Sequence, residues 1–177
     1  TFGLLNDFPI ADMIEYAKAN GCTGTKMRSI VKSDETIDAV LTQQFALATQ
    51  ISAAGLMPIV EPEVPIENLY KVEIEGLLES ALRQHLRDFK GKCILKLTLP
   101  EVNNLYFDVS NLPNVHKVVG LSGGYDTKEA CNRLGLQDNM TASFSRALSE
   151  GLLHSLTDDD FNAIISNNIK LITEASL

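Results

Sequence analysis

Short apolar segments alternate with longer amphipathic segments along the whole chain, and this alternation restricts the fold more than any other feature. The apolar segments are clearest at 56–60 (LMPIV), 93–99 (CILKLTL) and 115–121 (VHKVVGL). The segments between them carry apolar residues at the spacing of one helix face. Strands of this kind, each followed by an amphipathic helix, are typical of a parallel sheet covered by helices. We therefore predict an α/β fold.

Capping and turn residues set the expected boundaries of these elements. Ser33 and Asp126 are expected to cap helix N-termini, Thr157 and Asp160 form a capping box, and Arg146 is expected to enter a helix. The expected strands cover 22–31, 56–60, 93–99, 115–121 and 140–144, and the expected helices cover 10–20, 34–53, 67–89, 100–109, 126–134 and 161–175.

About five short strands with long helices suit a (β/α)8 barrel. A doubly wound sheet is the alternative. No G-x-G-x-x-G follows an expected strand and no Walker motif is present, so a nucleotide-binding version of that alternative has no support. The 177 residues, of which 45% are apolar, suffice for one core, and we expect 1–177 to form a single domain.

Charge and cysteine content argue against several classes of protein. A formal net charge of -8 without basic runs argues against nucleic-acid binding, although a few converging cations can still bind a small anion. No apolar run approaches the ~20 residues of a membrane span, and no signal peptide is visible. Cys22, Cys93 and Cys131 are odd in number and form no C-x-x-C, which favours reduced thiols in a cytoplasmic protein.

Lys96 is the most unusual residue, because it interrupts an apolar strand. Side chains alternate along a strand, so Ile94, Lys96 and Thr98 share one face and three leucines share the other. If the leucines pack under helices, Lys96 points into the barrel. Burial there favours the neutral amine, which is a nucleophile toward carbonyl groups. The alternative is a lysine that extends from the strand end into water.

Charged pairs also stand at the ends of two expected strands. Glu61 and Glu63 follow the strand 56–60 at i and i+2, so both carboxylates can face the same way where barrel enzymes place catalytic groups. One can act as a general acid or base while the other pairs with a lysine, and the alternative is a solvated pair in a loop. Lys26 and Arg28, also at i and i+2, can hold a phosphate, pair with these glutamates or be exposed.

A glycine-rich turn and a later arginine are candidate anion ligands. Ser122, Gly123 and Gly124 follow a strand and precede a helix, and glycines let backbone N–H groups approach an anion closely. Arg146 is a candidate second ligand for a phosphate. Turns of this composition and arginines in a first helical turn are also common without any ligand.

Metal binding is not indicated by the sequence. His85, His116 and His154 are scattered, no pair has ligand spacing, and there is no H-E-x-x-H motif. We therefore expect no metal ligands and a metal-independent chemistry.

Taken together, these segments resemble the class I, Schiff-base-forming fructose-bisphosphate aldolases, most closely their bacterial-type branch. Their combination in the family's order is strongly specific, although each is only moderately specific alone. The matching stretches are GTKMRS (24–29), QQFALATQISAAGLMPIVEPEV (43–64), ILKLTLP (94–100), NLY (104–106), LPNVHKVVGLSGGY (112–125) and ASFSRAL (142–148).

The resemblance implies roles for the charged residues. Lys96 stands at the family's Schiff-base lysine, and Glu61 stands at the acid/base glutamate that assists carbinolamine dehydration and carbon–carbon cleavage. Glu63 matches the neighbouring acidic residue that interacts with the lysines. Lys26 and Arg28 match basic residues near the reacting carbons and the far phosphate.

The resemblance also implies a binding site for dihydroxyacetone phosphate. Ser122, Gly123 and Gly124 match the loop at that end of the substrate, and Ser143 and Arg146 match the region that binds its phosphate. The implied ligand is a small phosphorylated sugar, and the implied reaction needs no cofactor beyond the covalent imine on lysine.

The implied activity is the reversible cleavage of fructose 1,6-bisphosphate to dihydroxyacetone phosphate and glyceraldehyde 3-phosphate, in glycolysis or gluconeogenesis. The family barrel has eight βα units, and these 177 residues resemble its C-terminal portion from just before the fourth strand. We therefore expect about five βα units with open sheet edges. The counterparts of an acidic residue on the first strand and a lysine on the third are not expected here, so the activity is expected to be incomplete.

Two other interpretations stay open. One is another Schiff-base barrel aldolase, transaldolase-like or deoxyribose-phosphate-aldolase-like, although paired phosphate sites favour a bisphosphate substrate. The other is an inactive truncated barrel that serves as an association domain. A homo-oligomer is possible, whereas nucleic-acid and membrane partners are not expected.

Overall fold

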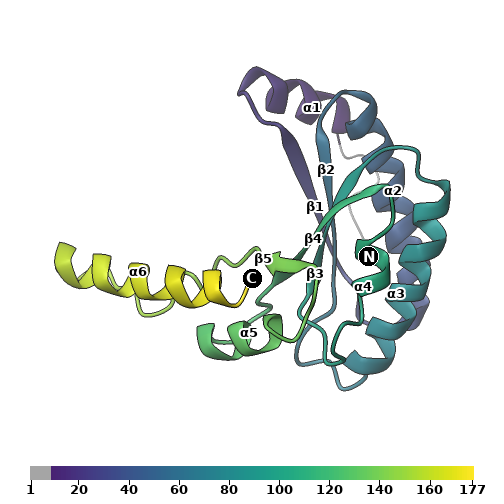
Figure 1. Ribbon diagram of the computed structural model, residues 1–177. Coiled ribbons are helices and arrows are strands. Elements are labelled where there is room, and N and C mark those ends of the chain that lie inside the picture. Colours follow the sequence, from purple (N-terminus) through teal and green to yellow (C-terminus); the bar gives the residue numbers. More distant parts are fainter. Residues whose placement is uncertain (1–8) are drawn as a thin grey trace.

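The computed structural model describes residues 9–177, and within them five strands form one parallel sheet (Figure 1). The order in the sheet, β1-β2-β3-β4-β5, is also the order in the sequence. Each strand therefore lies beside the next one along the chain, as in consecutive units of a barrel. The strands are β1 (Gly24–Ile30), β2 (Met57–Glu63), β3 (Cys93–Thr98), β4 (Val115–Leu121) and β5 (Met140–Ala142).

Helices connect the strands and cover the outer face of the sheet. Figure 1 shows α2 and α3 side by side on that face, while α6 extends away on the other side of the molecule. The helices are α1 (Ile10–Ala19), α2 (Ile37–Ala53), α3 (Lys71–Asp88), α4 (Phe107–Ser110), α5 (Thr127–Leu134) and α6 (Asp158–Glu174), and a short 3-10 helix, η1 (Asp34–Thr36), precedes α2. No described helix has the length and apolarity that a membrane crossing requires.

The two faces of the sheet differ in burial. Leu95, Leu97 and Leu99 point outward and are completely buried, as the alternation in β3 predicts. On the inner face, Ile59 and Ile94 are only half-buried. This face would be filled by side chains in a closed barrel. The structure is thus an open, five-stranded α/β sheet, which confirms the predicted fold class.

Strand β2 extends further than its apolar segment predicts. The expected strand ended at Val60, but β2 runs to Glu63 and pairs with β1 along its whole length. The polar pattern of Glu61 and Glu63 concealed this extension. Both glutamates therefore lie on the strand itself and not in a loop beyond it.

Three helix predictions were wrong in detail. The expected helix at 100–109 is mostly turns, because Asn104 has a positive φ of 58° that a right-handed helix excludes, and only α4 follows. Arg146 lies in hydrogen-bonded turns and not in a helix, and Gly151 in the same segment has a φ of 79°. Ser33 makes no capping bond with its side chain, so η1 replaces the first turn of α2.

Two predicted caps are confirmed. The carboxylate of Asp126 accepts a hydrogen bond from the Glu129 amide at 2.7 Å, and α5 follows to Leu134. The Thr157 hydroxyl oxygen accepts a hydrogen bond from the Asp160 amide at 3.2 Å and opens α6. Such caps satisfy N–H groups that a helix start leaves without partners.

Candidate functional site

Lys96 and Glu61 lie on neighbouring strands and face the inside of the sheet together. The side chain of Glu61 is 4% exposed and that of Lys96 is 16% exposed. The Nζ atom of Lys96 lies 3.4 Å from the Oε1 atom of Glu61. A largely buried amine is thus in contact with a buried carboxylate, as the sequence predicts for Lys96.

Glu61 and Glu63 each pair with a cation on β1. The second carboxylate oxygen of Glu61 accepts a hydrogen bond from Lys26, so Glu61 lies between two lysines. The Nε atom of Arg28 lies 2.6 Å from the Oε2 atom of Glu63. The hydrogen bond with Glu63 raises the pKa of Arg28, while desolvation opposes it. Of the interpretations open for this cluster, pairing between the cations and the glutamates is the one observed.

Gln44 of α2 holds the backbone of Glu61 from the outer face. Its Oε1 atom accepts a bond from the Glu61 N–H at 2.9 Å, and its Nε2 atom donates to the Glu61 carbonyl at 3.2 Å. The Gln44 side chain is completely buried. The register between β2 and β3 ends at Val60 and Leu95, so this side chain satisfies backbone groups that the neighbouring strand leaves free.

Thr98 connects β3 to the end of β2 again, beyond the point where the ladder between these strands ends. Its hydroxyl donates to the Val64 carbonyl at 2.8 Å, and its oxygen accepts from the Val64 N–H at 3.1 Å. Gln44 and Thr98 therefore fix β2 on both sides of Glu61 and Glu63. Backbone groups held in this way position the Glu61 carboxylate beside Lys96, while the Glu63 carboxylate pairs with Arg28.

A cavity of about 410 Å³ opens over these strands and collects most of the predicted site residues. Lys26 and Gly124 do not line it, but both are adjacent: Lys26 bonds Glu61, and a Cβ built on Gly124 would lie 3.8 Å from Arg146 Nη1. The lining residues are Arg28, Glu61, Glu63, Lys96, Leu121, Ser122, Gly123, Ser143, Ser145 and Arg146.

The glycine-rich turn is a close fit to its surroundings. The Tyr125 N–H donates to the Ser122 carbonyl at 2.9 Å and closes the turn. Gly123 has a φ of 64°, and a Cβ there would come within 2.6 Å of the Ile66 side chain. Glycine is therefore required at this position both by conformation and by space. The turn leaves its backbone beside the cavity, where an anion can approach it.

Ser143 and Arg146 reach the same cavity from the segment after β5. The Ser143 N–H donates to the Gly120 carbonyl at 2.8 Å, which anchors this segment to β4. No ion pair of Arg146 is found among residues 9–177, in contrast to Arg28. The site thus offers an exposed guanidinium group without a protein counter-charge, which is the usual condition for binding a phosphate.

Four residues of the site escaped prediction from sequence. Leu121 and Ser145 complete the lining, and Gln44 and Thr98 hold the strands. Gln44 carried a detectable signal, because it lies among the core-facing positions of α2 where an apolar residue is expected. The other three have ordinary residue types for their elements and gave no signal.

The whole arrangement brings a lysine amine, a carboxylate in contact with it, three serines and an arginine without a described ion pair to one cavity. The Lys96 amine can add to a carbonyl carbon, and Glu61 lies close enough to move a proton at that amine. The serines, the glycine turn and Arg146 line the same cavity and can bind an anionic group there. This constellation suits covalent chemistry on a small phosphorylated carbonyl compound.

Comparison with proteins of known identity found relatives that are named class 1 fructose-bisphosphate aldolases. The class 1 fructose-bisphosphate aldolase of Synechocystis sp. is 46% identical over 179 residues, covering 98% of this chain and 60% of that protein. The corresponding protein of Clostridium acetobutylicum is 44% identical over 176 residues, covering 96% and 60%. That of Porphyromonas gingivalis is 37% identical over 177 residues. The chain spans 60% of the length of these curated relatives, and no protein-family model matches it.

The fold has a counterpart of known structure. The chain superposes on fructose-bisphosphate aldolase from Plasmodium falciparum, solved in complex with TRAP and a small-molecule inhibitor, with a TM-score of 0.78. The match covers 99% of this chain and 66% of that chain at 16% sequence identity. The fold of the five-stranded sheet thus corresponds to about two thirds of that aldolase structure.

Proposed function

Since this chain is related along nearly all its length to part of the class I fructose-bisphosphate aldolases, we propose that it carries the Schiff-base centre of such an enzyme. Lys96 is the imine-forming lysine and Glu61 is its proton carrier. The observation that carries the proposal is the contact between the Lys96 amine and the Glu61 carboxylate at 3.4 Å in a largely buried position.

The chemistry follows from these two groups. The neutral Lys96 amine adds to the ketone carbon of a ketose phosphate and gives a carbinolamine. Glu61 in its acid form gives a proton to the carbinolamine hydroxyl, which leaves as water, and an iminium cation forms. Glu61, now a carboxylate, takes the proton of the hydroxyl on the β carbon as the bond between the α and β carbons breaks, which releases the aldehyde product. The electrons of that bond pass to the iminium group, so cleavage leaves an enamine and not a bare carbanion. Lys26, bonded to Glu61, orients the carboxylate during these transfers.

The anion-binding groups support a phosphorylated substrate. Arg146, Ser143 and the turn at Ser122 to Gly124 form one proposed phosphate site near Lys96. Arg28 on β1 forms the second proposed site: it pairs with Glu63 through Nε, and its side chain is 51% exposed, so its other N–H groups can receive a phosphate. Two phosphate sites favour fructose 1,6-bisphosphate over a monophosphate, with dihydroxyacetone phosphate as the ketone product.

We propose further that complete turnover requires the remaining βα units of a barrel. The inner face of the sheet is half-open at Ile59 and Ile94, and a pocket of this kind excludes water poorly. The groups that the relatives carry on the part not matched by this chain would close that face. The single domain expected for 1–177 is accordingly proposed to be one portion of a larger barrel.

Borohydride trapping tests the proposal. The chain is incubated with dihydroxyacetone phosphate, reduced and digested, and the added mass is located by mass spectrometry. We expect the adduct on Lys96, absent from Lys96→Met and retained in Lys117→Met, whose lysine is exposed on β4.

The same test is run on the chain joined to the remaining part of the Synechocystis relative. An adduct in only the joined protein would support the need for a complete barrel. A folded joined protein that labels another lysine, or none, would show the assignment of Lys96 to be wrong. Rates of cleavage of fructose 1,6-bisphosphate and fructose 1-phosphate then separate a bisphosphate aldolase from other Schiff-base aldolases.

A further inference from the structure

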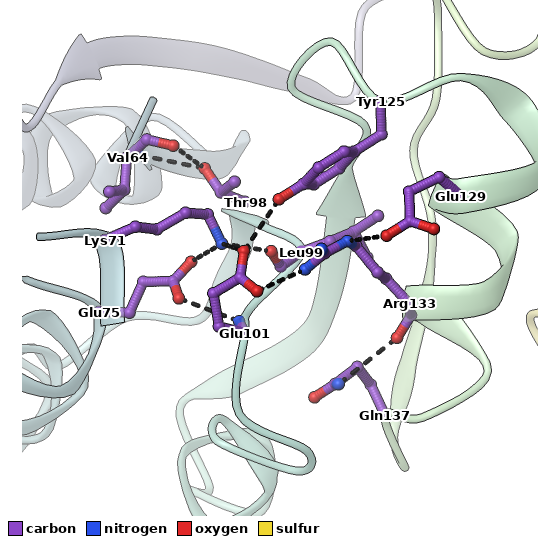
Figure 2. Close-up of polar contacts among 10 residues, drawn as sticks. All are labelled: Val64, Lys71, Glu75, Thr98, Leu99, Glu101, Tyr125, Glu129, Arg133 and Gln137. Atoms are coloured by element: carbon purple, nitrogen blue, oxygen red, sulfur yellow. Dashed lines mark hydrogen bonds and ion pairs between the residues drawn. The ribbon is translucent and has the colours of Figure 1, made fainter. Parts of the chain in front are cut away.

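Figure 2 shows a network of charged residues from the segments that follow β2, β3 and β4, and none of these charged residues lines the cavity. Its centre is Glu101, in the segment after β3. The Oε1 atom of Glu101 lies 3.2 Å from Lys71 Nζ and accepts a hydrogen bond from the Tyr125 hydroxyl at 3.0 Å. Its Oε2 atom lies 2.9 Å from Arg133 Nη1. One carboxylate thus receives three donors from three different segments.

Lys71 ties this carboxylate to the end of β3. It is the first residue of α3, its side chain is 4% exposed, and its ammonium group donates to the Leu99 carbonyl at 2.9 Å. The same group lies 2.6 Å from Glu75, which is completely buried. The Glu101 N–H in turn donates to Glu75 at 3.1 Å. The exit of β3 is therefore held against the first turn of α3 by side chain and backbone together.

Tyr125 ties the carboxylate to the glycine turn. It follows Gly124 directly, and its N–H closes the turn on Ser122. The guanidinium group of Arg133 lies 4.2 Å from the centre of the Tyr125 ring, while its Nε atom is held by Glu129 at 2.6 Å. Cation–π contact and the hydroxyl bond fix the ring at both its face and its tip.

The network therefore connects the loops that leave β2, β3 and β4. These strands carry Glu61, Lys96 and the start of the glycine turn, respectively. Stability alone explains the network poorly, because Glu101 and Arg133 are 32% and 23% exposed, and ion pairs that solvent reaches contribute little to stability. Their directional bonds instead determine how the loops sit relative to one another.

We propose that Glu101 is a positioning residue for the phosphate site. Through Tyr125 it holds the glycine turn, and through Lys71 it holds the end of β3, so that the turn stays at a set distance from Lys96. The inference rests on the proposed function for its link to Lys96. The hydrogen bond between Glu101 and Tyr125, which we call the tether, concerns only anion binding at the turn. Neither Glu101 nor Tyr125 lines the cavity, so both act through other residues.

Two substitutions separate positioning from general stability. Tyr125→Phe removes only the hydroxyl bond and leaves the ring on Arg133, whereas Glu101→Ala removes the centre of the network. Tyr106→Phe is the matched control, because the Tyr106 hydroxyl is buried and has no hydrogen-bond partner among the described residues. The affinities for inorganic phosphate and dihydroxyacetone phosphate are measured by calorimetry, and Lys96 labelling is measured at saturating dihydroxyacetone phosphate.

We expect Tyr125→Phe to weaken binding of both anions by roughly fivefold to tenfold, as loss of a bond to a charged group predicts. Its labelling rate at saturation should stay within about twofold of the parent, a split that general destabilisation would not give. Glu101→Ala should weaken binding further, and Tyr106→Phe should change neither quantity.

Unchanged phosphate affinity in Tyr125→Phe would overturn the inference, as would equal weakening in Tyr106→Phe. A parent that binds no phosphate would overturn it too, because there would be no site to position. A parent that binds phosphate but never labels Lys96 would contradict the proposed function alone. The comparison of phosphate affinities would still decide the tether.

Discussion

Glu61 touches the Lys96 amine with one carboxylate oxygen, at 3.4 Å, while its other oxygen accepts a hydrogen bond from Lys26. A carboxylate shared between two cations is held in one orientation, because rotation would break one contact to improve the other. It can therefore exchange a proton at Lys96 without first searching for a conformation. Among variants that keep Lys96, we therefore expect loss of Glu61 to slow imine formation most.

Glu61→Gln should slow borohydride-trapped labelling of Lys96. The amide keeps the shape of the side chain but cannot carry the proton, and general acid–base groups typically contribute about 10²–10⁴-fold. We expect a loss of that order at saturating dihydroxyacetone phosphate. Glu67→Gln, at an exposed position outside the cavity, is the control and should label normally. Equal labelling of both variants would remove Glu61 from the mechanism.

Gln44→Leu should both destabilise the protein and impair labelling. The leucine fills the volume but leaves the N–H and carbonyl of Glu61 buried without their partners. Each buried group left unsatisfied costs about 1–3 kcal/mol, so we expect a loss of ~2–4 kcal/mol in the free energy of unfolding. Urea unfolding measures it. Gln50→Leu makes the same change at an exposed site on α2 and should fall within about 0.5 kcal/mol of the parent.

Gly123→Ala should weaken phosphate binding and stability together. The residue has a φ of 64°, and the new methyl group would meet Ile66 at 2.6 Å. Strain of this kind costs about 1–3 kcal/mol and displaces the turn. Gly76→Ala in α3 meets no atom within 4 Å and should stabilise the helix by about 0.5–1 kcal/mol. Thermal unfolding and phosphate titration of the pair give both results, and an unaffected Gly123→Ala would argue against the observed turn.

The sequence predicted those parts of the fold that depend on local pattern. The bounds of β4 agree with the apolar run at 115–121, and Asp126 begins α5 as its residue type indicates. The alternation in β3 correctly placed Lys96 opposite the leucine face. The resemblance to the aldolases then indicated site residues on β1, β2 and β3 and in the segments after β4 and β5, which pattern alone does not do.

What the sequence did not predict depends on contacts between distant segments. The polar residues Glu61 and Glu63 obscured the end of β2, because their strand position is stabilised by β1 and by Gln44. The sequence analysis did not single out Lys71 and Glu75, whose i, i+4 spacing is that of many ordinary helix pairs. Their link to Glu101 was not predictable, since that contact depends on the path of a loop.

Reactivity of the three thiols should follow their burial. Burial raises the pKa of Cys93 to about 12 and also raises that of Cys131, while Cys22 is exposed. Only the thiolate reacts with alkylating reagents. Iodoacetamide at pH 8 should therefore modify Cys22 first, Cys131 slowly and Cys93 only after unfolding. Peptide mass spectrometry over time checks the order, and rapid modification of Cys93 in folded protein would contradict the buried β3 strand.

The pH dependence of stability should reflect two carboxylates, Glu101 and Glu75, whose pKa values are shifted in opposite directions. Burial alone would raise the pKa of Glu101, but bonds from Arg133 and Tyr125 and the charge of Lys71 lower it from 4.5 to about 2. Its ionised form therefore stabilises the folded state above about pH 4.5, and this stability is lost as the pH falls toward 2. Burial outweighs Lys71 at Glu75 and raises its pKa, so ionisation of Glu75 lowers stability as the pH rises above 4.5.

Comparing each glutamine variant with the parent separates the two effects. For Glu101→Gln, the loss in free energy of unfolding should be largest above pH 5 and shrink between pH 4.5 and 2. For Glu75→Gln, the difference in the free energy of unfolding between variant and parent should follow the opposite trend. It should become less unfavourable to the variant as the pH rises above 4.5. Glu73→Gln, exposed on the same helix, is the matched control. Urea unfolding from pH 2.5 to 7 measures all three, and parallel curves for Glu101→Gln and Glu73→Gln would mean that Glu101 is not held by its three donors in solution.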